Sequence, residues 1–256
     1  MNELSNNVAL ITGASRGIGA ATARVLVEQG YDICINYNNN LKAAENLQLE
    51  LQQERGSKTN KIIIKQADVS NEDQVVALFN FIDQELGCIT ALVNNAGILK
   101  PQTRLENLDA KRINEILITN VTSCFLCCRE AVKRMSTKHG GQGGSIVNVS
   151  SAAARSGAPG EYIDYAASKG AMDSMTKGLS LEVAGEGIRV NGVRPGFIYT
   201  DMHIDGGEAG RVDRLAPNIP MQRGGQASEV AEAISWLLSD KASYATGTFI
   251  DVAGGR

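Results

Sequence analysis

The sequence predicts an α/β fold: one doubly wound domain with a parallel sheet of about seven strands and helices on both faces. Two observations predict it. Short apolar runs alternate with longer segments of helical period along the chain, as in right-handed βαβ crossovers. Several runs, such as Ile62-Ile63-Ile64, are continuously apolar, which is typical of strands that are buried on both faces.

In the first half of the chain, each short apolar run is expected to be a strand and each longer periodic segment a helix. The expected strands are Val8–Thr12, Asp32–Asn36, Lys61–Gln66 and Ala91–Asn94. The expected helices that follow them are Gly17–Gly30, Leu41–Arg55, Asn71–Leu86 and one continuous helix around Leu108–Met135.

The second half repeats this pattern until it reaches an irregular segment. The expected strands are Ser145–Ser150, Ile188–Val193 and Thr248–Val252, and the expected helices are Tyr162–Ala184 and Ala227–Ser239. The segment Thr200–Gly225 is longer than most loops of compact domains and follows the carboxyl end of a strand, where open α/β sheets bind ligands. We therefore expect it to be a substrate lid on a single domain that spans residues 1–256, since no linker or repeat divides the chain.

The composition excludes several classes of protein. Hydrophobic residues make up 43% and charged residues 21%, which is ordinary for a globular protein and excludes intrinsic disorder. The formal charge is −3, which argues against a nucleic-acid partner, because phosphate neutralisation dominates such binding. No apolar run is long enough to span a membrane, and the N-terminus does not resemble a signal peptide.

The cysteines are odd in number and form no recognisable disulfide framework. They are Cys34, Cys88, Cys124, Cys127 and Cys128. Cys124-x-x-Cys127 has the spacing of a redox or metal motif, but it lies in an apolar stretch without matching ligands, so we expect core packing and no metal site. Together with the N-terminus, this indicates a cytoplasmic protein.

A glycine-rich turn joins the first expected strand to the first helix. The segment Thr12–Gly19 reads TGASRGIG. Glycines permit a tight turn and close approach of a ligand, and the helix start offers free N–H groups and a positive dipole end. The turn can therefore cradle a pyrophosphate. Its spacing, Gly-x-x-x-Gly-x-Gly, differs from the common dinucleotide fingerprint, so a purely structural turn is the alternative at this point.

The ribose end of such a cofactor would meet the residues after the second strand. NAD-binding proteins place an acidic residue there, whereas Ile35–Asn40 contains no carboxylate. Arg16, in the glycine turn and unopposed beside neutral Asn side chains, could meet a 2′-phosphate. The pattern favours NADP, with NAD possible if Arg16 is only a solvated surface charge.

A tyrosine and a lysine stand four residues apart on one expected helix. Tyr165 and Lys169 are therefore neighbours on its surface. A tyrosine with the ordinary pKa of about 10 is a poor base at neutral pH, and a nearby ammonium lowers that pKa. The pair can then act as a general acid or base. Ser150 or Ser151, at the carboxyl end of a strand, could hydrogen-bond a substrate carbonyl.

Seven short segments occur along the chain in the order found in one family. They are Thr12–Gly19, Asp68-Val69, Asn94–Gly97, Asn120-Val121, Ser150-Ser151, Tyr165–Lys169 and Arg194–Ile198. Together they cover nearly the whole chain, which resembles the short-chain dehydrogenase/reductase family of Rossmann-type oxidoreductases. Within it, the sequence is most similar to the bacterial glucose dehydrogenase-like and 3-oxoacyl carrier-protein reductase-like group.

The resemblance implies the catalytic roles. Tyr165 would be the acid/base, Lys169 would lower its pKa and bind the nicotinamide ribose, and Asn120 would hold a water that links Lys169 to solvent. Ser151 would polarise the substrate carbonyl. Ser151 and Tyr165 are fourteen residues apart, one more than in many members, so Ser150 is an alternative; Ser151 is favoured as the second of the pair.

The resemblance also implies which residues contact the cofactor. The glycine turn would hold the pyrophosphate, the residues after the second strand would meet the ribose, and later segments would line the adenine and nicotinamide ends. The expected contacts are Gly13, Ser15, Arg16, Gly17, Ile18, Gly19, Asn36, Tyr37, Asn38, Asp68, Val69, Asn95, Ala96, Gly97, Tyr165, Lys169, Pro195, Gly196, Ile198 and Thr200.

These features favour an NADP(H)-dependent oxidoreductase that interconverts a small carbonyl compound and its secondary alcohol. The substrate would be a small ketone, a polyol or a sugar such as glucose. A 3-oxoacyl carrier-protein reductase is the alternative, and the basic residues Lys133, Arg134, Lys138 and His139 could then dock an acidic partner. The segment Leu179–Glu182 weakens this alternative, because the fatty-acid reductases often carry an arginine there.

A non-catalytic NADP(H)-binding sensor is a further alternative from another class. The intact Ser–Tyr–Lys set speaks against it, because a sensor has no need of these groups. The resemblance also implies a homotetramer, with the helix Tyr162–Ala184 and the strand residues Phe249–Val252 in the subunit interfaces.

Overall fold

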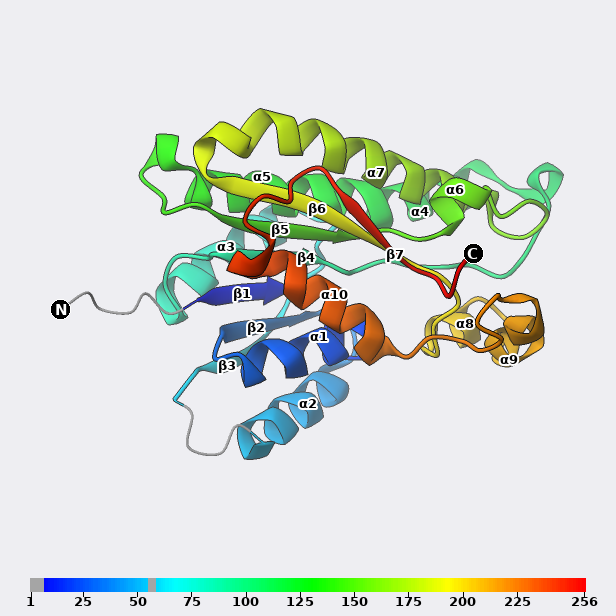
Figure 1. Ribbon diagram of the computed structural model, residues 1–256, viewed down its shortest axis with the longest axis horizontal. Helices are drawn as coiled ribbons and strands as arrows, with labels where there is room; N and C mark the ends of the chain where they lie inside the picture. The colour runs from blue at the N-terminus through cyan, green and yellow to red at the C-terminus, as the bar shows by residue number, and fades with distance from the viewer. Residues whose placement is uncertain (1–6, 55–58) are drawn as a thin grey trace.

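A computed structural model of the chain describes residues 7–54 and 59–256. They form one seven-stranded sheet in the order β3-β2-β1-β4-β5-β6-β7, and every pair of neighbours is parallel. Helices cover both faces of the sheet (Figure 1). The expected fold class is confirmed. The strand order reverses between β1 and β4, and such a switch point opens a ligand crevice at the carboxyl ends of the strands.

Each expected strand is present, with ends that differ by at most two residues. The strands are β1 Val8–Ile11, β2 Asp32–Tyr37, β3 Ile62–Gln66, β4 Ala91–Asn94, β5 Gly144–Val149, β6 Ile188–Pro195 and β7 Phe249–Val252. β6 continues through Pro195 because Gly192 to Pro195 pair with β7, which extends the sheet by one more strand.

The helices agree with the sequence pattern except in two regions. They are α1 Gly17–Glu28, α2 Leu41–Glu54, α3 Glu72–Glu85, α4 Ala110–Leu117, α5 Ser123–Met135, α6 Ala153–Ser156, α7 Ile163–Val183, α8 Met202–Asp205, α9 Arg211–Leu215 and α10 Ala227–Leu238. The expected end of the second helix at Arg55 lies outside the described residues.

Alternate residues of the strands face two separate cores. Ala9 and Ile11 of β1 pack with residues of α1, α2 and α10, whereas Val8 and Leu10 pack with residues of α3, α5 and α7. All four side chains are at most 2% exposed. Burial on both faces explains why these strands read as unbroken apolar runs. Four of the cysteines, Cys34 and the three on α5, are buried as expected, and only Cys88 is exposed.

The expected helix around Leu108–Met135 is present from Ala110 to Met135, but it is not α-helical throughout. A π-helical turn, Ile118–Thr122, separates α4 from α5. At its centre Asn120 is fully buried, and its side chain accepts a hydrogen bond from the Ile98 N–H (2.8 Å) and donates one to the Ile98 carbonyl (3.1 Å). A π turn inserts one residue into a helix, which here lets Asn120 bind the backbone that follows β4.

The segment Thr200–Gly225 is not irregular throughout. It contains α8, α9 and a short 3₁₀ turn, and it lies beyond the carboxyl ends of the strands (Figure 1). A bridge between Ile198 and Gly225 joins its two ends. Among the described residues, no helix combines the length and apolar character needed to cross a bilayer.

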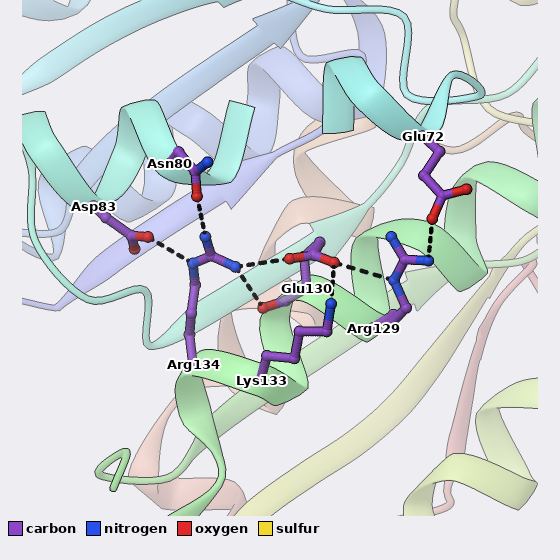
Figure 2. Close-up of polar contacts among 7 residues, drawn as sticks. All are labelled: Glu72, Asn80, Asp83, Arg129, Glu130, Lys133 and Arg134. Carbon is purple, nitrogen blue, oxygen red and sulfur yellow. Dashed lines mark hydrogen bonds and ion pairs between the residues drawn. The ribbon is translucent and has the colours of Figure 1, made fainter. Parts of the chain in front are cut away.

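A buried carboxylate on α5 joins this helix to α3. Glu130 is 3% exposed and accepts hydrogen bonds from Lys133 (2.8 Å), Arg134 (3.0 Å) and Arg129 (3.1 Å) (Figure 2). Burial opposes ionisation of Glu130, but the bonds from Lys133 and Arg134 outweigh it, so the pKa of Glu130 is lowered.

The two arginines of this cluster then reach across to α3. Arg134 donates to Asp83 and Asn80 (both 2.8 Å), and Arg129 donates to Glu72 (2.5 Å). The ionised Glu130 therefore holds two arginines in position between the helices.

We expect Glu130→Gln to lower the free energy of unfolding at pH 7 by about 2 kcal/mol, less than for a fully buried pair because its cations reach solvent. The folded pKa of Glu130 lies below the unfolded one, so its contribution is complete above the unfolded pKa of about 4.3 and is lost as the pH falls through the folded value. Urea unfolding at several pH values measures this. The difference in the free energy of unfolding between the wild type and Glu130→Gln should become smaller in acid. Glu106→Gln, at an exposed ion pair with Arg104, is the control and should change stability very little.

Candidate active site

The turn between β1 and α1 approaches the segment after β4 so closely that it requires glycine. Gly13 has a φ of +60°, and a Cβ there would lie 2.9 Å from the Ala96 Cα. A Cβ at Gly19 would lie 2.6 Å from the Asn95 side-chain nitrogen and 2.8 Å from the Ala14 Cα. Both contacts are shorter than folded proteins allow, so any larger residue would push the turn away from β4.

Two asparagines and a threonine fix this turn. The Asn95 side chain donates to the carbonyls of Thr12 (2.9 Å) and Gly13 (3.1 Å), and the Thr12 hydroxyl accepts from the N–H groups of Asn95 and Ala96 (both 3.0 Å). The Asn36 side chain accepts from the Gly13 N–H (3.3 Å) and donates to the Ala67 carbonyl (3.0 Å). Asn36 and Asn95 thus shape the crevice through the backbone.

The start of α1 fits a pyrophosphate. Arg16 occupies the N-cap position with an extended backbone and makes no side-chain cap, so among the described residues no side chain caps the N–H groups of this first turn. The first helical bond is that of Ala20 N–H to the Arg16 carbonyl (3.3 Å). Gly17, Ile18 and Gly19 therefore begin a helix at the switch point with free donors and a positive dipole end, which suits an anionic group.

Arg16 is not unopposed, as the sequence suggested. Its guanidinium pairs with Asp205 of α8 and lies 3.8 Å from a carboxylate oxygen of Asp201. These carboxylates come from the far segment Thr200–Gly225, which a reading of neighbouring residues cannot reveal. Tyr37 is buried at the end of β2, whereas Asn38 is exposed, and its carbonyl accepts from Gln66 (2.8 Å).

The remaining predicted cofactor contacts line the same edge of the sheet. After β3, Asp68 accepts from the N–H (2.9 Å) and hydroxyl (2.6 Å) of Ser70, and Val69 is buried. After β6, the Gly196 N–H donates to the Val252 carbonyl (2.9 Å), and the Pro195 carbonyl accepts from Ala152 (2.9 Å).

The chain from β6 then returns to the glycine turn. Ile198 is buried, and the Thr200 methyl group would lie 3.4 Å from a Cβ added at Gly17. Thr200 therefore lies close to the start of α1. The predicted contacts with the two ends of a dinucleotide lie along the carboxyl edge of the sheet.

Ser151 and Tyr165 meet at the carboxyl end of β5. The Ser151 hydroxyl lies near enough to Tyr165 to lower the pKa of its phenol, and the Ser151 oxygen accepts from the Ala153 N–H (3.1 Å) at the start of α6. Ser150 points elsewhere: it is buried, and its hydroxyl donates to the Lys169 carbonyl (3.3 Å) on α7. Of the two serines that the sequence left open, Ser151 is therefore the one that contacts Tyr165.

Burial controls the charges of Tyr165 and Lys169. Desolvation raises the pKa of Tyr165 to about 12, although the hydrogen bond with Ser151 opposes it. Desolvation lowers the pKa of Lys169 to about 8. The Lys169 nitrogen lies 5.7 Å from the centroid of the Tyr165 ring. At neutral pH the site therefore holds a protonated phenol beside an ammonium.

Lys169, Asn120 and Gly97 converge behind the tyrosine. The Lys169 ammonium donates to the Val149 carbonyl (2.7 Å), and Asn120 donates to the Ser168 hydroxyl (3.0 Å). A Cβ at Gly97 would lie 3.3 Å from the Asn120 oxygen and 3.6 Å from the Lys169 nitrogen. Gly97 therefore lies close to both polar groups.

An apolar wall stands beside Tyr165. Leu99 and Tyr162 form a buried cluster with it, and Met202, Ala153 and Ala158 pack against them. The sequence reasoning missed these wall residues. They lie in loops and short helices without periodicity, and the only available signal was their position between the recognised motifs.

The site defines a class of protein: an enzyme that binds a nicotinamide cofactor at the switch point of a parallel sheet and carries a Ser–Tyr–Lys set beside it. Residues 13–256 match the family model described as enoyl-(acyl carrier protein) reductase. The chain belongs to the short-chain dehydrogenase/reductase family and is an oxidoreductase. The resemblance inferred from the motifs is confirmed.

Several curated relatives align over nearly their full length. The chain is 64% identical over 249 residues to the uncharacterized oxidoreductase YgfF of Escherichia coli K12, covering 97% of this chain and 99% of the relative. It is 36% identical over 247 residues to the 3-oxoacyl-[acyl-carrier-protein] reductase FabG of Staphylococcus aureus Mu50, covering 96% of each. It is also 36% identical over 259 residues to an NADPH-dependent aldehyde reductase-like chloroplastic protein of Arabidopsis thaliana, covering 98% and 94%.

The close approach at Gly13 predicts a selective loss of cofactor binding. We expect Gly13→Ala to weaken binding at least tenfold, because both its positive φ and the contact with Ala96 would displace the turn. Fluorescence titration with NADPH measures this. Gly30→Ala is the matched control: its φ is +87°, but no atom lies within 4 Å of the added Cβ, so it should lower stability and leave affinity unchanged. Equal affinities for both variants would contradict the assignment of the turn.

Proposed function

We propose that the protein is an NADP(H)-dependent reductase of small ketones or aldehydes. The observation that carries this proposal is the buried Tyr165 phenol, which lies beside Ser151 and has the Lys169 nitrogen 5.7 Å from its ring centroid; burial raises the pKa of this phenol to about 12. Such a phenol is a proton donor at neutral pH, which is the state that carbonyl reduction requires.

The bound nicotinamide would supply the hydride. Ser151 would hold the substrate carbonyl oxygen, and Tyr165 would give that oxygen its proton. The resulting phenolate is stabilised by the Lys169 ammonium.

The charged residues near the start of α1 and the end of β2 support a preference for NADP. No carboxylate follows β2, and Arg16 stands at the start of α1. Its pairs with Asp205 and Asp201 are about half exposed and therefore weak, so a doubly charged 2′-phosphate can displace them. The Arabidopsis relative is named as an NADPH-dependent protein, which agrees with a preference for NADP.

The apolar wall supports a carbonyl compound that carries a small apolar substituent. Leu99, Tyr162 and Met202 offer mainly carbon surface beside Tyr165. A polyol or sugar would leave its hydroxyl groups without partners against this wall, at a cost of about 1–3 kcal/mol for each buried group. Small ketones and aldehydes avoid this cost.

Three of the four basic residues that could dock an acyl carrier protein are engaged within the chain. Lys133 and Arg134 pair with Glu130, and Arg134 also pairs with Asp83 (Figure 2). Lys138 pairs with Glu186 (2.6 Å). A neutralised cluster attracts an acidic partner only weakly, which speaks against the carrier-protein alternative.

We also propose that the enzyme assembles as a homotetramer in the cytoplasm and acts on a free small molecule, not on nucleic acid or at a membrane. Leu117, Ile118 and Phe125 support the assembly: they are 37%, 48% and 53% exposed along the α4–α5 run. A second copy of the chain would cover them.

Tyr165→Phe should lower kcat by about a thousandfold, because the proton donor is lost while binding surfaces remain. NADPH oxidation with a panel of small aldehydes and ketones measures turnover, with acetoacetyl thioesters and sugars as the competing classes. Tyr244→Phe, at a fully exposed tyrosine, is the control. Unchanged turnover in Tyr165→Phe would remove this residue from the mechanism, and NADPH binding without any turnover would favour the sensor alternative.

Arg16→Leu should weaken NADPH binding about tenfold and leave NADH binding unchanged, since only NADPH carries the 2′-phosphate. Asp205→Asn should act in the opposite direction, because it frees the Arg16 guanidinium. Dissociation constants for both cofactors test this. An equal effect of Arg16→Leu on NADPH and NADH would rule out the 2′-phosphate contact.

A further inference from the structure

A carboxylate lies behind the catalytic lysine on the same helix. Asp173 follows Lys169 by four residues on α7, so the two side chains are neighbours. The Asp173 side chain is only 16% exposed, and one of its oxygens accepts a hydrogen bond from the Arg194 Nε (2.8 Å). Its other oxygen, Oδ1, is buried and has no hydrogen-bond partner within residues 7–54 and 59–256.

Arg194 is itself held on several sides. It belongs to β6, directly before Pro195, and its guanidinium stacks on the Phe249 ring of β7 at 3.9 Å from the centroid. It also lies 3.5 Å from the Asp251 carboxylate. Arg194 therefore binds the Oδ2 oxygen of Asp173. The Oδ1 oxygen of the same carboxylate stays buried, and this side chain is a neighbour of Lys169 on α7.

The other charged and titratable groups near Lys169 are few. Cys124 of α5 and Tyr165 of α7 lie near it, and the Asp173 carboxylate raises its pKa. Beyond Arg194 lie Asp251 of β7 and Arg155 of α6, which pair with each other. At the start of α7, Asp164 pairs with Arg112 of α4. These outer groups are paired among themselves.

Lys169 needs this support because its surroundings disfavour charge. Its ammonium is 3% exposed, donates to the Val149 carbonyl, and otherwise meets the Met172 sulfur at 4.0 Å. Desolvation lowers the pKa of Lys169 to about 8, and Cys124 and then the Asp173 carboxylate oppose that fall. Without the carboxylate, a larger fraction of Lys169 would be neutral at physiological pH and unable to stabilise a phenolate.

We propose that Asp173, held by Arg194, is a positioning residue of this site whose free carboxylate oxygen keeps Lys169 in its ammonium form. It contacts neither substrate nor cofactor and acts through the lysine. The inference rests on the proposed role of Lys169, but it concerns the charge of that side chain and needs no substrate.

The test is an NMR titration of the full chain carrying lysine labelled with ¹³C at Cε, with the Lys169 signal assigned by its absence in Lys169→Arg. We expect Asp173→Asn to lower the pKa of Lys169 by about one unit, because a negative charge is lost beside an ammonium. Arg194→Met should raise it, since the Asp173 charge is then uncompensated. Asp173→Glu, which keeps a carboxylate, should leave the Lys169 pKa at its wild-type value.

Asp251→Asn is the matched control. It removes another carboxylate that contacts Arg194, on the strand away from Lys169, and should leave the titration nearly unchanged. An unchanged Lys169 pKa in Asp173→Asn would overturn the proposal. A lower Lys169 pKa in Arg194→Met would also overturn it, because it would indicate loosened packing. Failure of the proposed reductase function would instead show in the turnover assays with Tyr165→Phe, which the titration does not use.

Discussion

The burial of one ammonium group constrains much of the site. Lys169 reaches the carboxyl edge of the sheet through the core face of α7, and the groups around it compensate for lost water: the Val149 carbonyl at 2.7 Å, and the Asp173 carboxylate. The π turn between α4 and α5 brings Asn120 to the same space. The irregularity in that helix thus belongs to the same arrangement as the lysine.

The second constraint is the contact of two backbones at the switch point of the sheet. The glycine turn after β1 lies against the segment after β4, and Asn95 and Asn36 bind it through the main chain. Both asparagines are therefore required for the shape of the turn, whether or not they touch a ligand. The shape of this turn is therefore set by contacts within the chain, at the switch point where open α/β sheets bind ligands.

The sequence was most informative where chemistry is local. Strands buried on both faces read as apolar runs, and the pair Tyr165 and Lys169 follows from helical spacing. Prediction failed where a contact with a segment distant in the sequence determines the local structure. The carboxylates that pair with Arg16 come from residues 201 and 205, and the π turn within the helix around Leu108–Met135 accompanies a hydrogen bond to Ile98. Only the resemblance to a family identified Asn120, and no pattern identified Leu99, Tyr162 or Met202.

The apolar wall has a consequence for how such an enzyme can change over evolution. Ser151, Tyr165 and Lys169 are anchored to β5 and α7, whereas the wall residues come from connecting segments, and α8 and α9 lie beyond the sheet. Substitutions in those segments alter what fits beside Tyr165 without moving Ser151, Tyr165 or Lys169. The scaffold can therefore acquire new substrates by drift in its loops while its reaction chemistry stays the same.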